Sequence, residues 1–143
     1  MAGRPVLAAC LGLCLAAAIV TAAPLAFVSI QRGTRSAIVE PREVVLASDA
    51  EWRALWARHV PGAGSPPSVD FTGEIVVGVF AGQQPTGGYQ VEIVGVDHEP
   101  AEVVVRYRIE RPPPGGLVTQ ILTQPFHLVR LPRLGIPVRF HKL

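Results

Sequence analysis

The chain has 143 residues, of which 49% are hydrophobic. Lysine and arginine total 13 against 11 acidic residues, so the formal net charge of +2 gives no strong basic excess and argues against a nucleic-acid-binding protein. Both cysteines, Cys10 and Cys14, lie near the start of the chain. A domain formed by the remaining residues therefore has neither a disulfide nor a cysteine nucleophile, and packing must hold it together.

The first 30 residues are typical of an export segment. No charged residue occurs from Pro5 to Ile30, and within this run Val20-Thr21-Ala22 matches the small-residue pattern that precedes a cleavage site. One interpretation is a signal peptide of residues 1–22, cleaved after Ala22. A second is an uncleaved signal anchor over residues 5–30, which is long enough to cross a bilayer as a helix. Cys10 also lies in a weak lipoprotein-like context. All three interpretations predict an extracytoplasmic protein, either secreted or associated with the cell envelope.

Cleavage after Ala22 would leave 121 of the 143 residues, enough for a single domain. We expect a tether over residues 23–35 and one domain over residues 36–143. After a segment of extended character that ends at Leu46, Ser48 and Glu51 match a helix capping box. The helix that follows places four residues on one face, at i, i+3, i+4 and i+7: Trp52, Leu55, Trp56 and His59. This face is predicted to pack the helix onto a sheet, because such a short helix needs tertiary burial to persist.

Strands are predicted after the helix. Residues 74–80 form a continuous apolar run that suits a central strand, and residues 89–93 and 103–110 alternate as two strands of an antiparallel hairpin. Further short strands are expected at residues 117–122, 125–131 and 138–141. The absence of a βαβ rhythm predicts an α+β fold: an antiparallel β-sheet of about five to six strands, with a sandwich arrangement left open, and one N-terminal amphipathic helix packed on it.

The loop after the central strand is the most distinctive feature. Gly82 and Gly87 have the spacing of P-loop glycines, but Gly88 and Tyr89 stand where lysine and serine or threonine are required, so phosphate binding is not expected. The loop carries no acid, base or thiol, which favours recognition over catalysis. We predict no enzyme activity and no cofactor or metal. The expected binding residues are Gln84, Pro85, Thr86, Gly87, Gly88 and Tyr89, with a second candidate loop at Pro112, Pro113, Pro114, Gly115 and Gly116.

Two alternatives stay open. The two glycines of the first loop can instead satisfy a tight turn, with Tyr89 packed in the core. In a different class, three histidines from separate strands could converge with one carboxylate to form a metal site or a small active site. The candidate residues for that alternative are His98, His127, His141 and Asp70. Asp70 otherwise reads as a turn-capping residue beside the buried strand.

A family resemblance rests on three stretches: Val69-Asp70-Phe71, Pro85-Thr86-Gly87-Gly88-Tyr89, and Thr123 through Val129. Together they resemble the C-terminal domain of the PrcB protease-complex subunit family, from about Val44 to the end of the chain. The family's namesake is an exported, non-catalytic subunit associated with a surface protease, so the resemblance implies an exported, non-catalytic module that binds or stabilises a protein partner, with an extracellular protease as one candidate. The Pro85–Tyr89 loop is also similar to the Asn-Pro-Thr-Thr-Gly-Tyr loop of chagasin-type protease inhibitors, although Gln84 replaces the asparagine and a glycine replaces the second threonine.

Overall fold

The computed structural model describes residue 3 and residues 21–143. Most of the apolar run behind the signal-peptide and anchor predictions lies outside these described residues. Within the part of the chain that is described, no helix is both long enough and apolar enough to cross a membrane.

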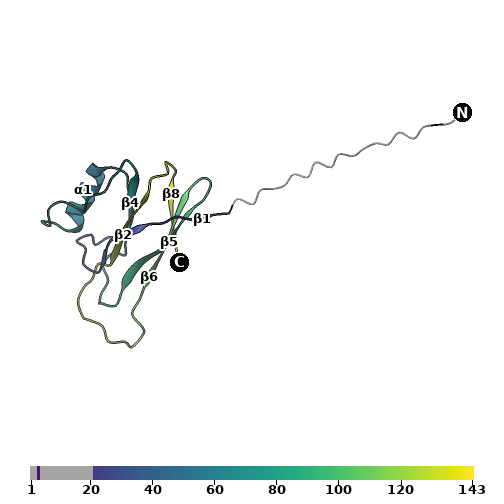
Figure 1. Ribbon diagram of the computed structural model, residues 1–143. Coiled ribbons are helices and arrows are strands. Elements are labelled where there is room, and N and C mark those ends of the chain that lie inside the picture. The colour runs from purple at the N-terminus through teal and green to yellow at the C-terminus, as the bar shows by residue number, and fades with distance from the viewer. Residues whose placement is uncertain (1–2, 4–20) are drawn as a thin grey trace.

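The described residues form two sheets of four strands each and one helix (Figure 1). One sheet has the order β1-β5-β6-β8, and the other has the order β2-β7-β4-β3. The elements are β1 (Ala23–Pro24), β2 (Val28–Gly33), β3 (Arg42–Leu46), α1 (Asp49–His59), β4 (Glu74–Phe80), β5 (Gln90–His98), β6 (Val103–Glu110), β7 (Phe126–Pro132) and β8 (Val138–Lys142).

The main core lies between the two sheets. Alternate residues of β4, such as Val77 and Val79, share one buried cluster with Val91 of β5 and Val105 of β6. Because successive side chains of a strand point to opposite faces, the intervening β4 residues face away from this core. Strand β4 is therefore apolar on both faces, which confirms its predicted central position.

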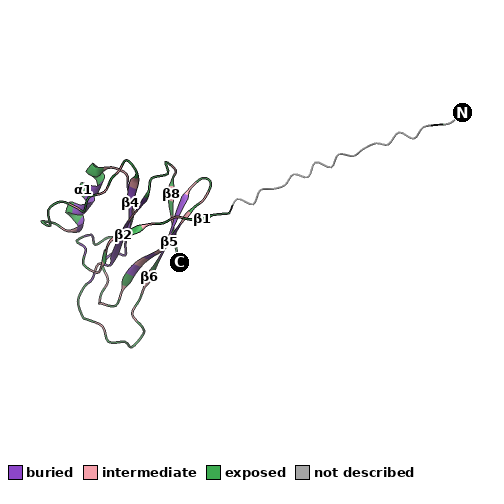
Figure 2. Ribbon diagram, in the orientation of Figure 1, coloured by how far each residue is buried: buried purple, intermediate pink, exposed green. Residues whose placement is uncertain are grey.

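Helix α1 covers the outer face of the β2-β7-β4-β3 sheet. Trp52 and Trp56 pack in a second buried cluster with Phe80 of β4 and Leu128 of β7, and Figure 2 shows the buried face of the helix turned toward the sheet. The Ser48 side chain accepts a hydrogen bond of 3.2 Å from the backbone N–H of Glu51. This contact confirms the predicted N-cap, and the burial of all four predicted face residues confirms how the helix packs.

The predicted single sheet of five to six strands is wrong, because eight strands divide into two sheets. Antiparallel pairing predominates as expected, but β8 pairs with β6 in parallel. The helix is not N-terminal either, since three strands precede it. The alternating pattern of the sequence predicted the hairpin of β5 and β6. The parallel pairing of β6 with β8 instead requires the chain to cross from one sheet to the other after β7, and local patterning does not encode such a crossing.

Residues 23–35 are not a free tether. Strand β1 pairs with the end of β5, and β2 pairs with β7 from Val28 to Gly33. Strand β2 is an outer strand whose side chains are mostly exposed or half-buried, so it lacks the apolar alternation that would have revealed it. The strand predicted over residues 117–122 is also absent. Only Thr123, just after it, forms an isolated bridge, and its partner is Gln84.

Candidate functional site

Two loops, residues 82–89 and 111–125, form one hydrogen-bonded unit, which we call the paired loops. Gln84 and Thr123 exchange backbone hydrogen bonds of 2.7 and 3.1 Å, and the Gly87 N–H donates to the Thr119 carbonyl at 2.9 Å. The Thr123 hydroxyl donates to the Thr86 carbonyl at 2.8 Å. In Figure 1 the longer loop, coloured yellow-green, extends away from the sheets beyond the end of β6. The structure therefore brings the two candidate loops of the sequence together.

Two glycines of the first loop are required by geometry. Gly82 has φ of 78°, and a Cβ placed on it would lie 2.8 Å from Cδ of Pro41. Gly88 has φ of 89°, and its Cβ would lie 2.7 Å from Cβ of Pro112. Contacts this close, with a positive φ, exclude any larger residue without movement of the backbone. Gly87 differs, because its φ is not positive and a Cβ there would meet only Thr119 at 3.4 Å.

The other residues of the motif mainly build the loop. The Gln84 side-chain amide donates to the Ala81 carbonyl at 3.3 Å, and the Thr86 hydroxyl donates to the Gly87 carbonyl at 2.9 Å. Tyr89 is half-buried, whereas Pro85 is exposed. The Pro-Thr-Gly-Gly-Tyr sequence thus has a clear structural role, and Pro85 is its most accessible side chain.

The most exposed apolar side chains of the paired loops lie on the second loop. Leu117 is fully exposed, Leu122 is 59% exposed and Ile121 is 44% exposed. Figure 2 shows this loop as exposed or intermediate over most of its length. Pro113 to Gly116 are likewise exposed, whereas Pro112 is half-buried against Gly88. Sequence reasoning missed these three aliphatic residues because they were assigned to a strand, although their irregular spacing around Thr119 and Gln120 argued against alternation.

Ile121 and Leu122 also line an open hollow of about 620 Å³ beside the end of α1. The other lining residues are Arg35, Ser36, Ala37, His59, Val60, Pro61 and Gln124. An exposed apolar group next to a concave surface is typical of a protein interaction site.

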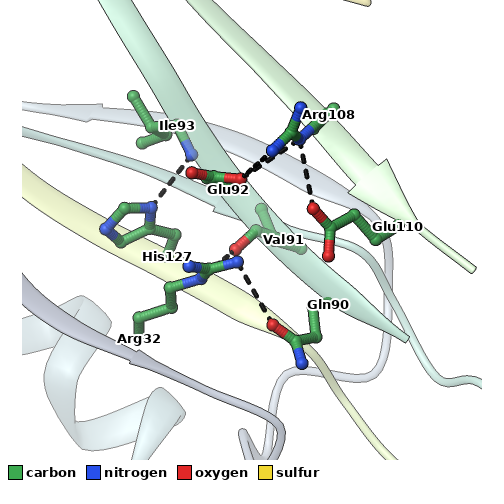
Figure 3. A network of polar contacts seen from close by, with 8 residues as sticks. All are labelled: Arg32, Gln90, Val91, Glu92, Ile93, Arg108, Glu110 and His127. Atoms are coloured by element: carbon green, nitrogen blue, oxygen red, sulfur yellow. Dashed lines mark hydrogen bonds and ion pairs between the residues drawn. The ribbon is translucent and has the colours of Figure 1, made fainter. Parts of the chain in front are cut away.

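His127 serves the fold. Its Nδ1 accepts the backbone N–H of Ile93 at 2.9 Å, so Nε2 carries the ring proton and donates to the Ser29 hydroxyl at 2.8 Å. Burial, together with the nearby Arg32 guanidinium, lowers the pKa of His127 to about 4. Arg32 in turn donates to the Val91 carbonyl at 2.6 Å (Figure 3). The hydrogen bonds of His127 and Arg32 thus join β7 and β2 to β5. Because both nitrogens of His127 are hydrogen-bonded, neither is free to bind a metal.

The surface of β5 and β6 continues this network. Arg108 donates to Glu92 at 2.6 and 3.1 Å and lies 3.2 Å from Glu110, as Figure 3 shows. The hydrogen bond from Arg108 lowers the pKa of Glu92. These charged groups lie on an exposed strand surface and form ion pairs with one another, which is typical of a solvated charge cluster with no binding role.

The proposed convergence of His98, His127, His141 and Asp70 does not occur. Among residue 3 and residues 21–143, no group of three histidine, cysteine, aspartate or glutamate side chains could hold a metal ion. The Asp70 carboxylate accepts hydrogen bonds from the hydroxyl and the N–H of Thr72, which lower the pKa of Asp70. Asp70 therefore caps the turn before β4, as its structural reading predicted.

Fold and site together define a small two-sheet β domain, with one helix on an outer face and a pair of mutually bonded loops at one end. Within it, residues 75–132 match the family described as PrcB C-terminal. The match runs from β4 to the end of β7 and includes the paired loops, which confirms the resemblance to this family over that segment. No curated protein and no protein of solved structure matches the chain.

Proposed function

We propose that this chain is an exported, non-catalytic protein-binding module, and that the paired loops contact its partner. The observation that carries the proposal is the exposure of Leu117, Ile121 and Leu122 on a loop that the Pro85–Tyr89 turn holds by hydrogen bonds. Large aliphatic side chains on an ordered surface lower the free energy of a complex when a partner covers them.

The match to the PrcB C-terminal family over residues 75–132 supports a partner within a protease complex, because the namesake of that family is a subunit associated with a surface protease. Two modes suit the loops. In the stabilising mode, the exposed aliphatic side chains cover an apolar patch outside the protease cleft. In the inhibitory mode, the exposed Pro85 end of the first loop enters the cleft, as in chagasin-type inhibitors. A binding role needs no cofactor and no catalytic residue in this chain.

Capture of partners from an envelope fraction of the native cells tests the proposal. The comparison uses the wild type, the double variant Leu117→Ser/Leu122→Ser, and the control Leu134→Ser. Leu134 is 37% exposed and lies outside the paired loops. All three proteins should show the same thermal unfolding. We expect a protein captured by the wild type and by the control to be lost from the double variant, whereas identical partner lists for all three would refute the proposal.

A further inference from the structure

A groove runs between the outer strands of the two sheets. Strand β3 is outermost in one sheet and β8 is outermost in the other. Two hollows, of about 290 and 320 Å³, lie at this position, and they share Ala81, Ile109 and Lys142. The first also contacts Arg42 and Glu43 of β3. Because the hollows adjoin, we treat them as one surface, the seam groove.

The seam groove is electropositive. Arg42, Arg111 and Lys142 line it, and within the described residues none of them forms an ion pair. By contrast, Arg106, Arg108 and Arg139 of the adjacent sheet are each paired with a carboxylate at 3.2 Å or less.

The α-carboxylate of Leu143 adds a negative charge at the second hollow, and one acidic side chain, Glu43, lines the first. Glu43 is engaged by the Tyr107 hydroxyl, and burial together with this hydrogen bond raises the pKa of Tyr107 to about 12. Three cations without an ion pair against two carboxylates, one of them engaged by Tyr107, leave the groove with an excess of positive charge.

The strand edges beside the groove suit an extended chain. An outer strand presents unpaired backbone N–H and C=O groups along its free edge, and an added strand can bond to them. Here the ends of two such strands, at Arg42–Glu43 and at Lys142, line the groove, and the half-buried Ile109 adds an apolar side chain to it. A segment that alternates acidic and apolar residues would place its carboxylates at the cations and its other side chains on this apolar lining.

We propose that the seam groove binds an extended, acidic segment of the partner protein. This inference rests on the proposed function, because Gln84 and Tyr89 of the paired loops line the second hollow. A peptide is favoured over an anionic membrane, since the cations line a groove bounded by strand edges, whereas lipid headgroups are met by basic residues on an outward-facing surface.

Selection from a library of random ten-residue peptides tests this inference. The targets are the purified wild type, the triple variant Arg42→Gln/Arg111→Gln/Lys142→Gln, and the control Arg53→Gln/Arg58→Gln. The control removes two exposed cations of helix α1, which covers the outer face of the β2-β7-β4-β3 sheet and does not line the groove. We expect peptides selected on the wild type and the control to contain at least twice the acidic content of the unselected library. The best of them should bind the triple variant at least tenfold more weakly.

Three outcomes would overturn the inference. One is that no peptide is selected, and another is that the selected peptides show no acidic excess or bind the triple variant equally well. The third is that phosphatidylglycerol vesicles, but not acidic peptides, bind in a way that requires the three cations, which would assign the groove to a lipid surface. If the Leu117→Ser/Leu122→Ser variant loses the captured partner while the triple variant keeps it, the groove inference fails and the proposed function stands. If acidic peptides bind but the loop variant keeps every partner, the proposed function fails.

Discussion

The buried His127 makes the stability of the domain depend on pH in a defined direction. Its pKa is lowered from 6.5 to about 4, first by burial and then by Arg32, while Glu92 acts in the opposite sense. Between these two values the unfolded chain binds a proton that the folded chain does not, so the free energy of unfolding falls as the pH falls. It should decrease by about 1.4 kcal/mol per pH unit, and by about 2.5 kcal/mol in total at pH 4.5.

The second buried histidine acts in the same direction. The two ring nitrogens of His59 form hydrogen bonds of 2.8 Å with the Ser36 hydroxyl and the Gln31 side chain, and burial lowers the pKa of His59. A substitution must therefore isolate His127. Glutamine at position 127 can accept the Ile93 N–H through its oxygen and donate to Ser29 through its nitrogen, but it does not titrate.

Urea unfolding of the wild type and of His127→Gln, measured from pH 7.5 to pH 4.5, checks this reasoning. We expect the wild type to lose about 2.5 kcal/mol more than the variant over this range. Two curves that fall in parallel would refute the conclusion that the fold holds His127 neutral.

The remaining predictions concern packing and backbone geometry. Gly88→Val should lower the free energy of unfolding by about 2–3 kcal/mol, because the new side chain collides with Pro112 at a positive φ, whereas Gly87→Ala should change it by less than about 1 kcal/mol. Equal effects in chemical denaturation would contradict the distinct roles of the two glycines. Trp52→Ala should cost about 3–5 kcal/mol, since this side chain is fully buried under the helix, and a loss below about 1 kcal/mol would show that α1 does not anchor there. Ser48→Ala should cost about 1 kcal/mol in thermal unfolding through loss of the N-cap, and an unchanged Tm would count against that cap.

The sequence predicted those elements whose signals are local. Ser48 and Glu51 mark the start of the helix, and the spacing of Trp52 and Trp56 identifies its buried face. The continuous apolar run of residues 74–80 identifies the central strand. Each of these signals results from contacts between residues close together in the chain or from buried residues that recur at the regular spacing of a helix or strand. Such signals can be recognised without knowledge of the topology.

The errors have a common physical origin in nonlocal pairing. Strand β2 has few buried side chains and gains its place from hydrogen bonds to β7, which lies almost 100 residues further along the chain. The parallel pairing of β8 with β6, and hence the division into two sheets, also depends on distant partners. Such contacts leave little imprint on the residues of an outer strand.

The sequence showed only part of how the candidate site is built. The unusual glycines drew attention to residues 84–89, yet the structure assigns Gly88 to a close approach with Pro112. The exposed Leu117 and Leu122 could not be separated from core residues by composition, because exposure depends on what the fold places beside a side chain. Sequence reasoning therefore identified the loop and missed its apolar surface.

The central claim is that the paired loops bind a protein partner, and site-specific crosslinking in the native cells tests it most directly. A photoreactive amino acid would replace Leu117 in one strain and Leu134 in another, because both positions are exposed and only the first belongs to the paired loops. The account predicts one specific crosslinked protein at position 117, absent at position 134, with a component of a protease complex as the expected partner. No crosslink at position 117 above background, or the same crosslinked protein at both positions, would contradict it.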